Sequence, residues 1–244
     1  MKNVLYLLLV ILISASCRKG TVKPEQSITY KIPDIADPVP GRTVDTIPII
    51  RKYHNVVILG NSITFSMPDP SIDWYNDWGM AASKPEFDYV HLLTAKLKVI
   101  SPDVKISLQQ TYVFEKTYTT YDYVTNFAGV KALHPDLLIM RFGENVEQDS
   151  VGAANFDAIY GSLIAYFKDG NPDVKILAVG SFWGNAVVDG PMKKYSKFVT
   201  LSPLLSDPGN QAFGQYANYG VSIHPSDKGM KQICSIIWGG LNGL

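Results

Sequence analysis

Cysteine, net charge and long apolar segments are all scarce in this chain, and each shortage excludes a class of protein. Two cysteines in 244 residues are too few for a disulfide-stabilised scaffold. The 22 basic and 22 acidic side chains cancel, whereas a nucleic-acid-binding protein needs a surplus of Lys and Arg to displace counterions. Charged residues make up only 18% of the chain and hydrophobic residues 46%, which excludes intrinsic disorder. What remains is a globular enzyme or ligand-binding protein with one sizeable core.

The sequence also lacks the usual signatures of a bound cofactor. No metal-ligand spacing, phosphate-binding loop or dinucleotide-binding fingerprint stands out. We therefore expect a protein that uses no metal and no cofactor, and that has no nucleic-acid partner.

The first residues have the pattern of an export signal. Lys2 precedes the apolar run 4–13, which is too short to span a hydrocarbon core of about 30 Å as a helix. Small residues then lead to Cys17, and this arrangement resembles a bacterial lipobox, in which the cysteine is acylated and becomes the mature N-terminus. Ser14 stands where a lipobox usually has Leu, and the alternative is a plain secretory signal with Cys17 an incidental residue. We expect a lipoprotein signal at 1–16 and a protein anchored to a bacterial membrane through Cys17, on the periplasmic or the cell-surface side.

Residues 17–51 differ from the rest of the chain because prolines interrupt them. Proline at this spacing disfavours a helix and favours an extended segment. We therefore predict a Pro-rich tether over 17–51 that leads to a folded domain over 52–244, although the apolar piece 47–50 could dock on that domain. The prolines are Pro24, Pro33, Pro38, Pro40 and Pro48.

The pattern of the domain is one of strands alternating with helices. Apolar runs typical of buried parallel strands occur at Val56–Leu59, Val104–Ile106, Leu137–Met140 and Val174–Leu177. Helical spacing of apolar residues occurs at Tyr89–Leu97, Tyr121–Lys131, Phe156–Phe167 and Met230–Ile237. This alternation predicts a doubly wound α/β sheet, in which function gathers in the loops that follow the carboxyl ends of the strands.

Three polar residues in such loops have side chains suited to nucleophilic catalysis. Ser62 stands in a glycine-led turn after the first apolar run, where a hydroxyl can be exposed beside backbone N–H groups, as a nucleophile needs. Asn145 follows the third run, and its side-chain amide can donate to a developing oxyanion. His224 lies at a loop-to-helix junction near the end of the chain, where it can act as general base. Helix capping by the serine and self-bonding of the loop asparagine are the ordinary structural alternatives.

Together these features resemble the SGNH, or GDSL-type, hydrolase family. They are, in order, Gly-Asn-Ser ending at Ser62, a lone Gly79, Gly-x-Asn ending at Asn145, and His-Pro starting at His224. The resemblance implies a three-layer α/β/α sandwich around a doubly wound, mainly parallel five-stranded sheet of the flavodoxin-like type. It also implies that Ser62 is the nucleophile, that His224 is the base, and that Gly79 and Asn145 belong to the oxyanion hole. Members of the family mostly cleave carboxylic esters, including acetyl groups on carbohydrates.

The chain departs from the family's pattern at the residue that orients the histidine. The triad aspartate of the family lies three residues before the histidine, and Val221 occupies that position. Loss of an orienting carboxylate costs about four orders of magnitude in turnover in serine proteases. A backbone carbonyl near residues 221–222 could replace it, or a carboxylate from another loop, for which Glu144 and Glu147 are the candidates. We interpret Asp227 as a first-turn acid of the last helix.

The stretch 66–86 is long and rich in aromatic residues. Trp74 and Trp78 lie within it among several aspartates, and Trp183 follows a later strand. Flat aromatic faces beside carboxylates suit packing on sugar rings, so these three tryptophans are candidate substrate-binding residues. The alternative is a lid that packs its aromatic side chains over the core.

The sequence therefore predicts an exported, membrane-anchored serine esterase. It would cleave carboxylic esters, among them acetyl esters on carbohydrates, through an acyl-enzyme on Ser62. Two alternatives stay open, a catalytically silent glycan-binding module that kept the crevice and a glycan O-acyltransferase.

Overall fold

The computed structural model describes residues 30–31, 52–147 and 150–244. The predicted lipoprotein signal and Cys17 lie outside the described residues, and so does the predicted tether apart from one pair. That pair, Tyr30–Lys31, forms a short strand at the edge of the sheet, so this piece of the 17–51 range is docked on the domain. In the part of the chain that the structure describes, no helix has both the length and the apolar character needed to cross a membrane.

A six-stranded sheet in the order β1-β3-β2-β4-β5-β6 forms the middle of the domain. The strands β2 to β6 run parallel, as the sequence predicts, and β1 pairs antiparallel with β3. The central strands consist almost wholly of buried apolar residues, because helices cover the sheet on both faces. The strands are β1 (Tyr30–Lys31), β2 (Asn55–Gly60), β3 (Lys105–Gln110), β4 (Leu137–Arg141), β5 (Lys175–Val179) and β6 (Lys197–Val199).

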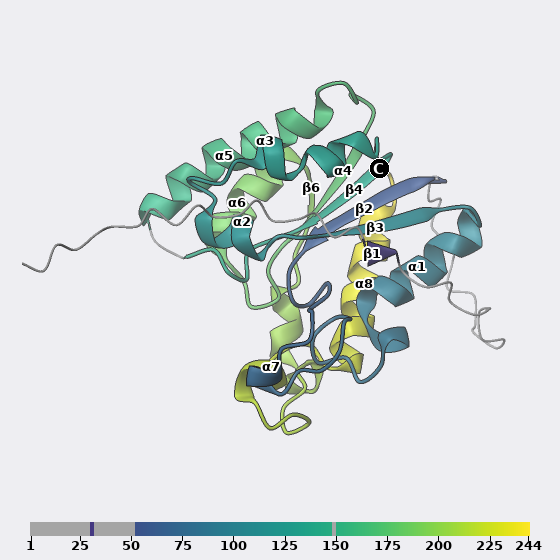
Figure 1. Cartoon of the computed structure of the whole chain (residues 1–244), viewed down its shortest axis with the longest axis vertical. Coiled ribbons are helices and arrows are strands. Elements are labelled where there is room, and N and C mark those ends of the chain that lie inside the picture. The colour runs from purple at the N-terminus through teal and green to yellow at the C-terminus, as the bar shows by residue number, and fades with distance from the viewer. Residues whose placement is uncertain (1–29, 32–51, 148–149) are drawn as a thin grey trace, which may run out of the picture.

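The helices form the two outer layers of a three-layer α/β/α sandwich, which confirms the predicted fold class (Figure 1). One face of the sheet is covered by α1 and α8, and the other by α2 to α6. The helices are α1 (Tyr89–Ile100), α2 (Tyr112–Thr117), α3 (Tyr123–Asn126), α4 (Ala128–Ala132), α5 (Ser150–Lys168), α6 (Ala186–Tyr195), α7 (Tyr219–Ser222) and α8 (Asp227–Leu241). Short 3-10 turns lie at η1 (Pro70–Ile72), η2 (Pro85–Phe87), η3 (Ser202–Ser206) and η4 (Pro208–Asn210).

Strand β2 shows how the two apolar layers are built. Successive side chains of a strand point to opposite faces, so Val56 and Ile58 join the core that contains α1 and α8. Val57 and Leu59 join the core that contains α5 and α6. All four side chains are at most 1% exposed, and this burial on both faces is why the strand appears in the sequence as an uninterrupted apolar run.

Two elements differ from the sequence-based expectation. The predicted helix over 121–131 is two short helices, α3 and α4, because Phe127 caps the end of one and the start of the other. The edge strand β6 has only three residues, none of them fully buried, so it carries no continuous apolar run that would reveal it in the sequence.

The order of the strands places a crevice beside β2. The chain passes from β2 to β3 on one side and then returns to β4 on the other side of β2. Ligands in open α/β sheets bind at such a reversal, outside the carboxyl ends of the strands. Ser62 follows β2 and Asn145 follows β4, so both lie at this reversal.

Candidate active site

Ser62 lies in a tight turn directly after β2. The backbone amide of Thr64 donates to the carbonyl of Asn61 over 2.7 Å, which closes the turn around Ser62. Gly60 makes this turn possible, because a Cβ at that position would lie 1.9 Å from Oγ1 of Thr64. Ser62 itself is half-buried and lines an open pocket.

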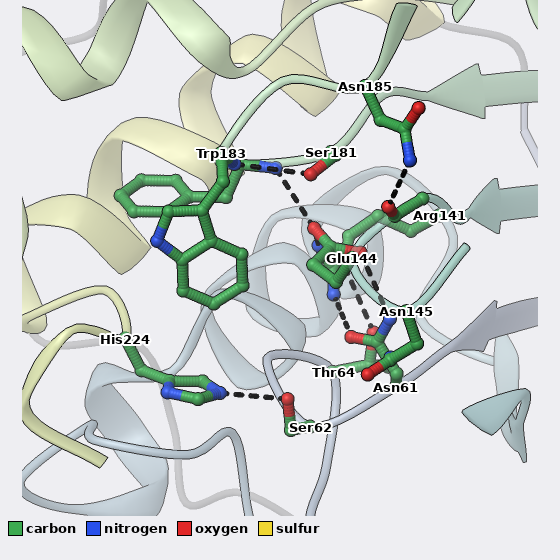
Figure 2. Close-up of polar contacts among 12 residues, drawn as sticks. Asn61, Ser62, Thr64, Arg141, Glu144, Asn145, Ser181, Trp183, Asn185 and His224 are labelled. Atoms are coloured by element: carbon green, nitrogen blue, oxygen red, sulfur yellow. Dashed lines mark hydrogen bonds and ion pairs between the residues drawn. The ribbon is translucent and has the colours of Figure 1, made fainter. Parts of the chain in front are cut away.

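His224 contacts the hydroxyl of Ser62 directly (Figure 2). The distance from Ser62 Oγ to His224 Nε2 is 2.9 Å, and on the other side of the ring Nδ1 lies 2.7 Å from the carbonyl oxygen of Gly220 in α7. A carbonyl oxygen can only accept, so Nδ1 carries the hydrogen and Nε2 is left as the acceptor. This tautomer is the one that a general base for Ser62 requires.

The protonation state of the ring also suits a base. Burial lowers the pKa of His224 from its ordinary 6.5 to about 4, against the opposing effects of the Gly220 carbonyl and of the Glu144 charge. The imidazole is therefore neutral near pH 7 and can accept a proton.

The carboxylate that orients His224 in the family is absent from this structure, and neither predicted substitute replaces it. Val221 is fully buried at the family's aspartate position. The carboxylate of Glu144 is engaged by other groups, and Glu147 is exposed at the end of its loop. The alternative in which Glu144 or Glu147 holds the imidazole is wrong, since Nδ1 is bound by the backbone carbonyl of Gly220. The other alternative, a backbone carbonyl that orients the imidazole, is the one that the structure has. The carbonyl belongs to Gly220, one residue before the expected 221–222.

A buried charged network lies beside Ser62 and His224, and the sequence did not reveal it (Figure 2). Arg141, the last residue of β4, donates to Glu144 over 2.6 Å and to the side-chain oxygen of Asn61 over 2.5 Å. The side chains of Arg141 and Glu144 are only 0% and 3% exposed. Glu144 also accepts from Asn61 and from the backbone amide of Phe182. The network therefore joins the turn that carries Ser62 to the loops after β4 and β5.

Glu115 in α2 extends this network towards Asn145. It is 1% exposed, and its carboxylate accepts from the side chain of Asn61 over 2.7 Å and from the backbone amide of Asn145 over 2.8 Å. Burial, reinforced by the negative charge of Glu144, raises the pKa of Glu115 to about 7. All of its hydrogen-bond partners are donors, so the geometry is that of the ionised form.

The two predicted oxyanion donors have different outcomes. Asn145 lines the pocket together with Ser62, which is where an oxyanion donor must lie. The backbone amide of Gly79 instead donates to Oδ2 of Asp88 over 3.1 Å, so this N–H is not available to an oxyanion and its predicted role is wrong. The glycine is needed for packing, because a Cβ there would lie 2.7 Å from the carbonyl oxygen of Ile63.

The three tryptophans also have different outcomes. Trp183 lines the pocket, and its ring meets the ring of His224 edge-on, with 5.2 Å between the centroids (Figure 2). Trp74 is fully buried and donates its indole N–H to the carbonyl of Ser66, so the prediction that it binds substrate is wrong. Trp78 is half-buried, packs edge-on against Trp74 and is not one of the described residues that line the pocket. The stretch 66–86 thus packs these two rings inward, as the lid alternative proposed.

The pocket that these side chains form has a volume of about 380 Å³. Its lining residues are Ser62, Glu144, Asn145, Trp183, Ile223 and His224. Over residues 52–147 and 150–244, no group of three or more His, Cys, Asp or Glu side chains is arranged to hold a metal ion. The polar groups that line the pocket are a hydroxyl, an imidazole, a carboxylate and a side-chain amide.

Solved structures of other proteins have a fold similar to that of this chain. A two-domain esterase active on acetylated mannans matches with a TM-score of 0.50 and 18% identity, over 77% of this chain and 48% of its own. This chain thus spans about half the length of that esterase. A protein assigned as a GDSL-like lipase from Parabacteroides merdae matches with a TM-score of 0.50 and 16% identity, over 80% of this chain and 97% of its own. The chain shares the three-layer α/β/α fold of these two proteins. No protein-family model and no curated protein matches the sequence.

The sequence did not predict three residues of this site. Glu115 lies in a six-residue helix and contacts residues that are distant in the chain, and a lone helical glutamate carries no sequence signal. The Gly220 carbonyl is a backbone group, so the residue type at this position does not indicate its role. Arg141 is the last residue of the buried apolar strand β4, at the carboxyl end where the site forms. Because charged side chains are rarely buried unless they are paired, an arginine at this position could have indicated a buried ionic contact.

Proposed function

We propose that this protein is a serine ester hydrolase of the SGNH type. The observation that carries the proposal is the contact of Ser62 with His224 over 2.9 Å, with the far nitrogen of the ring held by the Gly220 carbonyl. Nucleophilic acyl transfer requires a nucleophile next to a base that is in turn oriented by a third group, and these three groups are in contact here. The orienting group here is a carbonyl dipole in place of a carboxylate, so the site works as a dyad.

In the proposed first step, Ser62 Oγ attacks the carbonyl carbon of a bound ester. His224 Nε2 takes the serine proton as the new C–O bond forms. The carbonyl oxygen becomes an oxyanion, and the Asn145 side chain and the backbone amide of Ser62 donate hydrogen bonds to it. The tetrahedral intermediate collapses when the imidazolium gives its proton to the leaving alcohol, which leaves an acyl group on Ser62.

The second step reverses these roles with water as the nucleophile. Neutral His224 Nε2 takes a proton from a water molecule, whose oxygen attacks the acyl-enzyme. Collapse of the second intermediate releases the carboxylic acid and returns the proton to Ser62. The lowered pKa of His224 makes its imidazolium more acidic than an ordinary one, which favours return of the proton to Ser62.

We propose an acetylated carbohydrate as the substrate class. Trp183 beside His224 supplies an aromatic ring at the pocket, and such a ring can pack on the C–H face of a sugar. The similar two-domain esterase is active on acetylated mannans, which supports the same class for this chain. We also propose that the protein is exported and anchored to a membrane through Cys17. This proposal rests on the lipobox-like sequence alone.

The test is ester hydrolysis by the purified protein with an aryl acetate and with an acetylated mannan or xylan. We expect the wild type to release acetate, and both Ser62→Ala and His224→Ala to lower kcat by at least about 10³-fold. Equal rates for the three proteins would overturn the hydrolase proposal and favour a silent glycan-binding module. Transfer of acetyl to an added glycan in place of water would identify an acyltransferase.

A further inference from the structure

The carboxylate of Glu115 is surrounded by hydrogen-bond donors. Oε1 accepts from the side-chain amide of Asn61 over 2.7 Å and from the hydroxyl of Thr111 over 3.3 Å. Oε2 accepts from the backbone amides of Gly143 and Asn145 over 3.1 and 2.8 Å, and from the side-chain amide of Asn145 at 3.5 Å. The carboxylate therefore holds both ends of the short loop that follows β4.

The contact with the Asn145 side chain has a chemical consequence. A carboxamide has a donor end and an acceptor end, and an ionised carboxylate can only accept. The nitrogen of Asn145 therefore faces Glu115, and it has a second hydrogen that this contact does not use. Half a rotation of the amide would exchange its nitrogen and its oxygen, so the oxygen would face the ionised carboxylate of Glu115 and be repelled by it.

We propose that Glu115 is a positioning residue for the oxyanion hole, which fixes the Asn145 amide with its N–H available to the pocket. The proposal rests on the proposed hydrolase function, because it assigns Glu115 a part in the same reaction. Glu115 touches no substrate in this account, and its effect on the oxyanion hole is transmitted by Asn145 and the 143–145 loop.

The proposal makes the reaction sensitive to the charge of Glu115. Its pKa is raised to about 7 by burial and by Glu144, while the charge of Arg141 and the donors from Asn61 and Asn145 oppose that shift. Glu115 is ionised above this pH and protonated below it. A protonated carboxyl would place an O–H against the amide hydrogens of Asn145, so kcat should fall as the pH drops through about 7. The pKa of His224, at about 4, would not produce a loss in that range.

The kinetic test is a double-mutant cycle of Glu115→Gln and Asn145→Ala on an aryl acetate. Loss of one oxyanion donor lowers kcat by about 10²–10³-fold, so we expect that loss in N145A and a loss of at least about tenfold in E115Q, with KM unchanged in both. Because Glu115 acts through Asn145, the double variant should be no slower than N145A. Losses that multiply in the double variant would overturn the proposal. Asp169→Asn, the same chemical change at an 80% exposed carboxylate, should leave kcat unchanged.

The pH profile and the amide signal of Asn145 provide tests that do not depend on E115Q folding. Asn145→Ala should lose the fall in kcat near pH 7 that the wild type shows, and an unchanged fall would contradict the proposal. In ¹⁵N-labelled protein, the side-chain amide resonances of Asn145, identified by their absence in N145A, should titrate near pH 7 in the wild type. Resonances that do not move overturn the positioning role whether or not the protein is an esterase. If they move and the wild type hydrolyses no ester, the positioning stands and the hydrolase proposal falls.

Discussion

Arg141→Met should destabilise the domain more than any single change of a surface charge. Arg141 is 0% exposed and bonds to Glu144, whose side chain is 3% exposed, and to Asn61. Removal of one partner from a buried ion pair costs about 3–5 kcal/mol, because the other charge is left uncompensated. Here the change leaves the carboxylates of Glu144 and Glu115 facing each other without the cation. For a domain of this size, that free energy corresponds to a fall in Tm of about 6–20 °C.

The assay is thermal unfolding followed by circular dichroism at pH 7. The matched control is Lys228→Met, which breaks an ion pair with Asp207 whose side chains are 55% and 48% exposed and should lower Tm by no more than about 4 °C. The double variant R141M/E144Q should recover part of the R141M loss, because it removes one of the uncompensated carboxylates. An R141M protein that melts within the range of K228M would refute the view that this network holds the site together.

Two further predictions test the placement of aromatic and titratable groups. Trp74→Ala should lower the free energy of unfolding by about 3–5 kcal/mol, because its ring is fully buried. Trp183→Ala should cost less than that, because its ring is only partly buried, but it should raise KM for an acetylated glycan and not for an aryl acetate; equal stability losses would contradict this assignment. The folded pKa of His224 lies at about 4, below its ordinary 6.5, so the unfolded chain takes up the proton first as the pH falls. Stability should therefore fall by up to about 3 kcal/mol between pH 6.5 and 4, and urea unfolding of His224→Gln should lack that part of the loss.

The parts of the fold that the sequence predicts are those that are buried on both sides. The run Val56–Leu59 is apolar because both faces of β2 are covered, and the same reason makes β4 and β5 visible in the sequence. The strand β6 escapes prediction because it is short and only partly buried. Position in such a sheet also predicts which loops meet, and this is why Ser62 and Asn145 line the same pocket.

The parts of the site that the sequence does not predict depend on contacts between distant segments. The orientation of His224 is set by a backbone carbonyl, which leaves no trace in the identity of Gly220. Trp74 looks like a binding residue in a polar, aromatic loop, yet its ring packs against Met80 and Val221. Glu115 has its role only because α2 lies beside the loop after β4. In each case the residue type allows several roles and the tertiary contact decides among them.

Covalent labelling of Ser62 by a fluorophosphonate tests the central claim most directly, because it measures activation of the nucleophile without any choice of ester. The account predicts that the wild type is labelled on the peptide that contains Ser62, and that the label is lost in both Ser62→Ala and His224→Ala. Labelling of the wild type and of His224→Ala at the same rate, or no labelling of the wild type, would contradict the claim that these two residues form a working dyad.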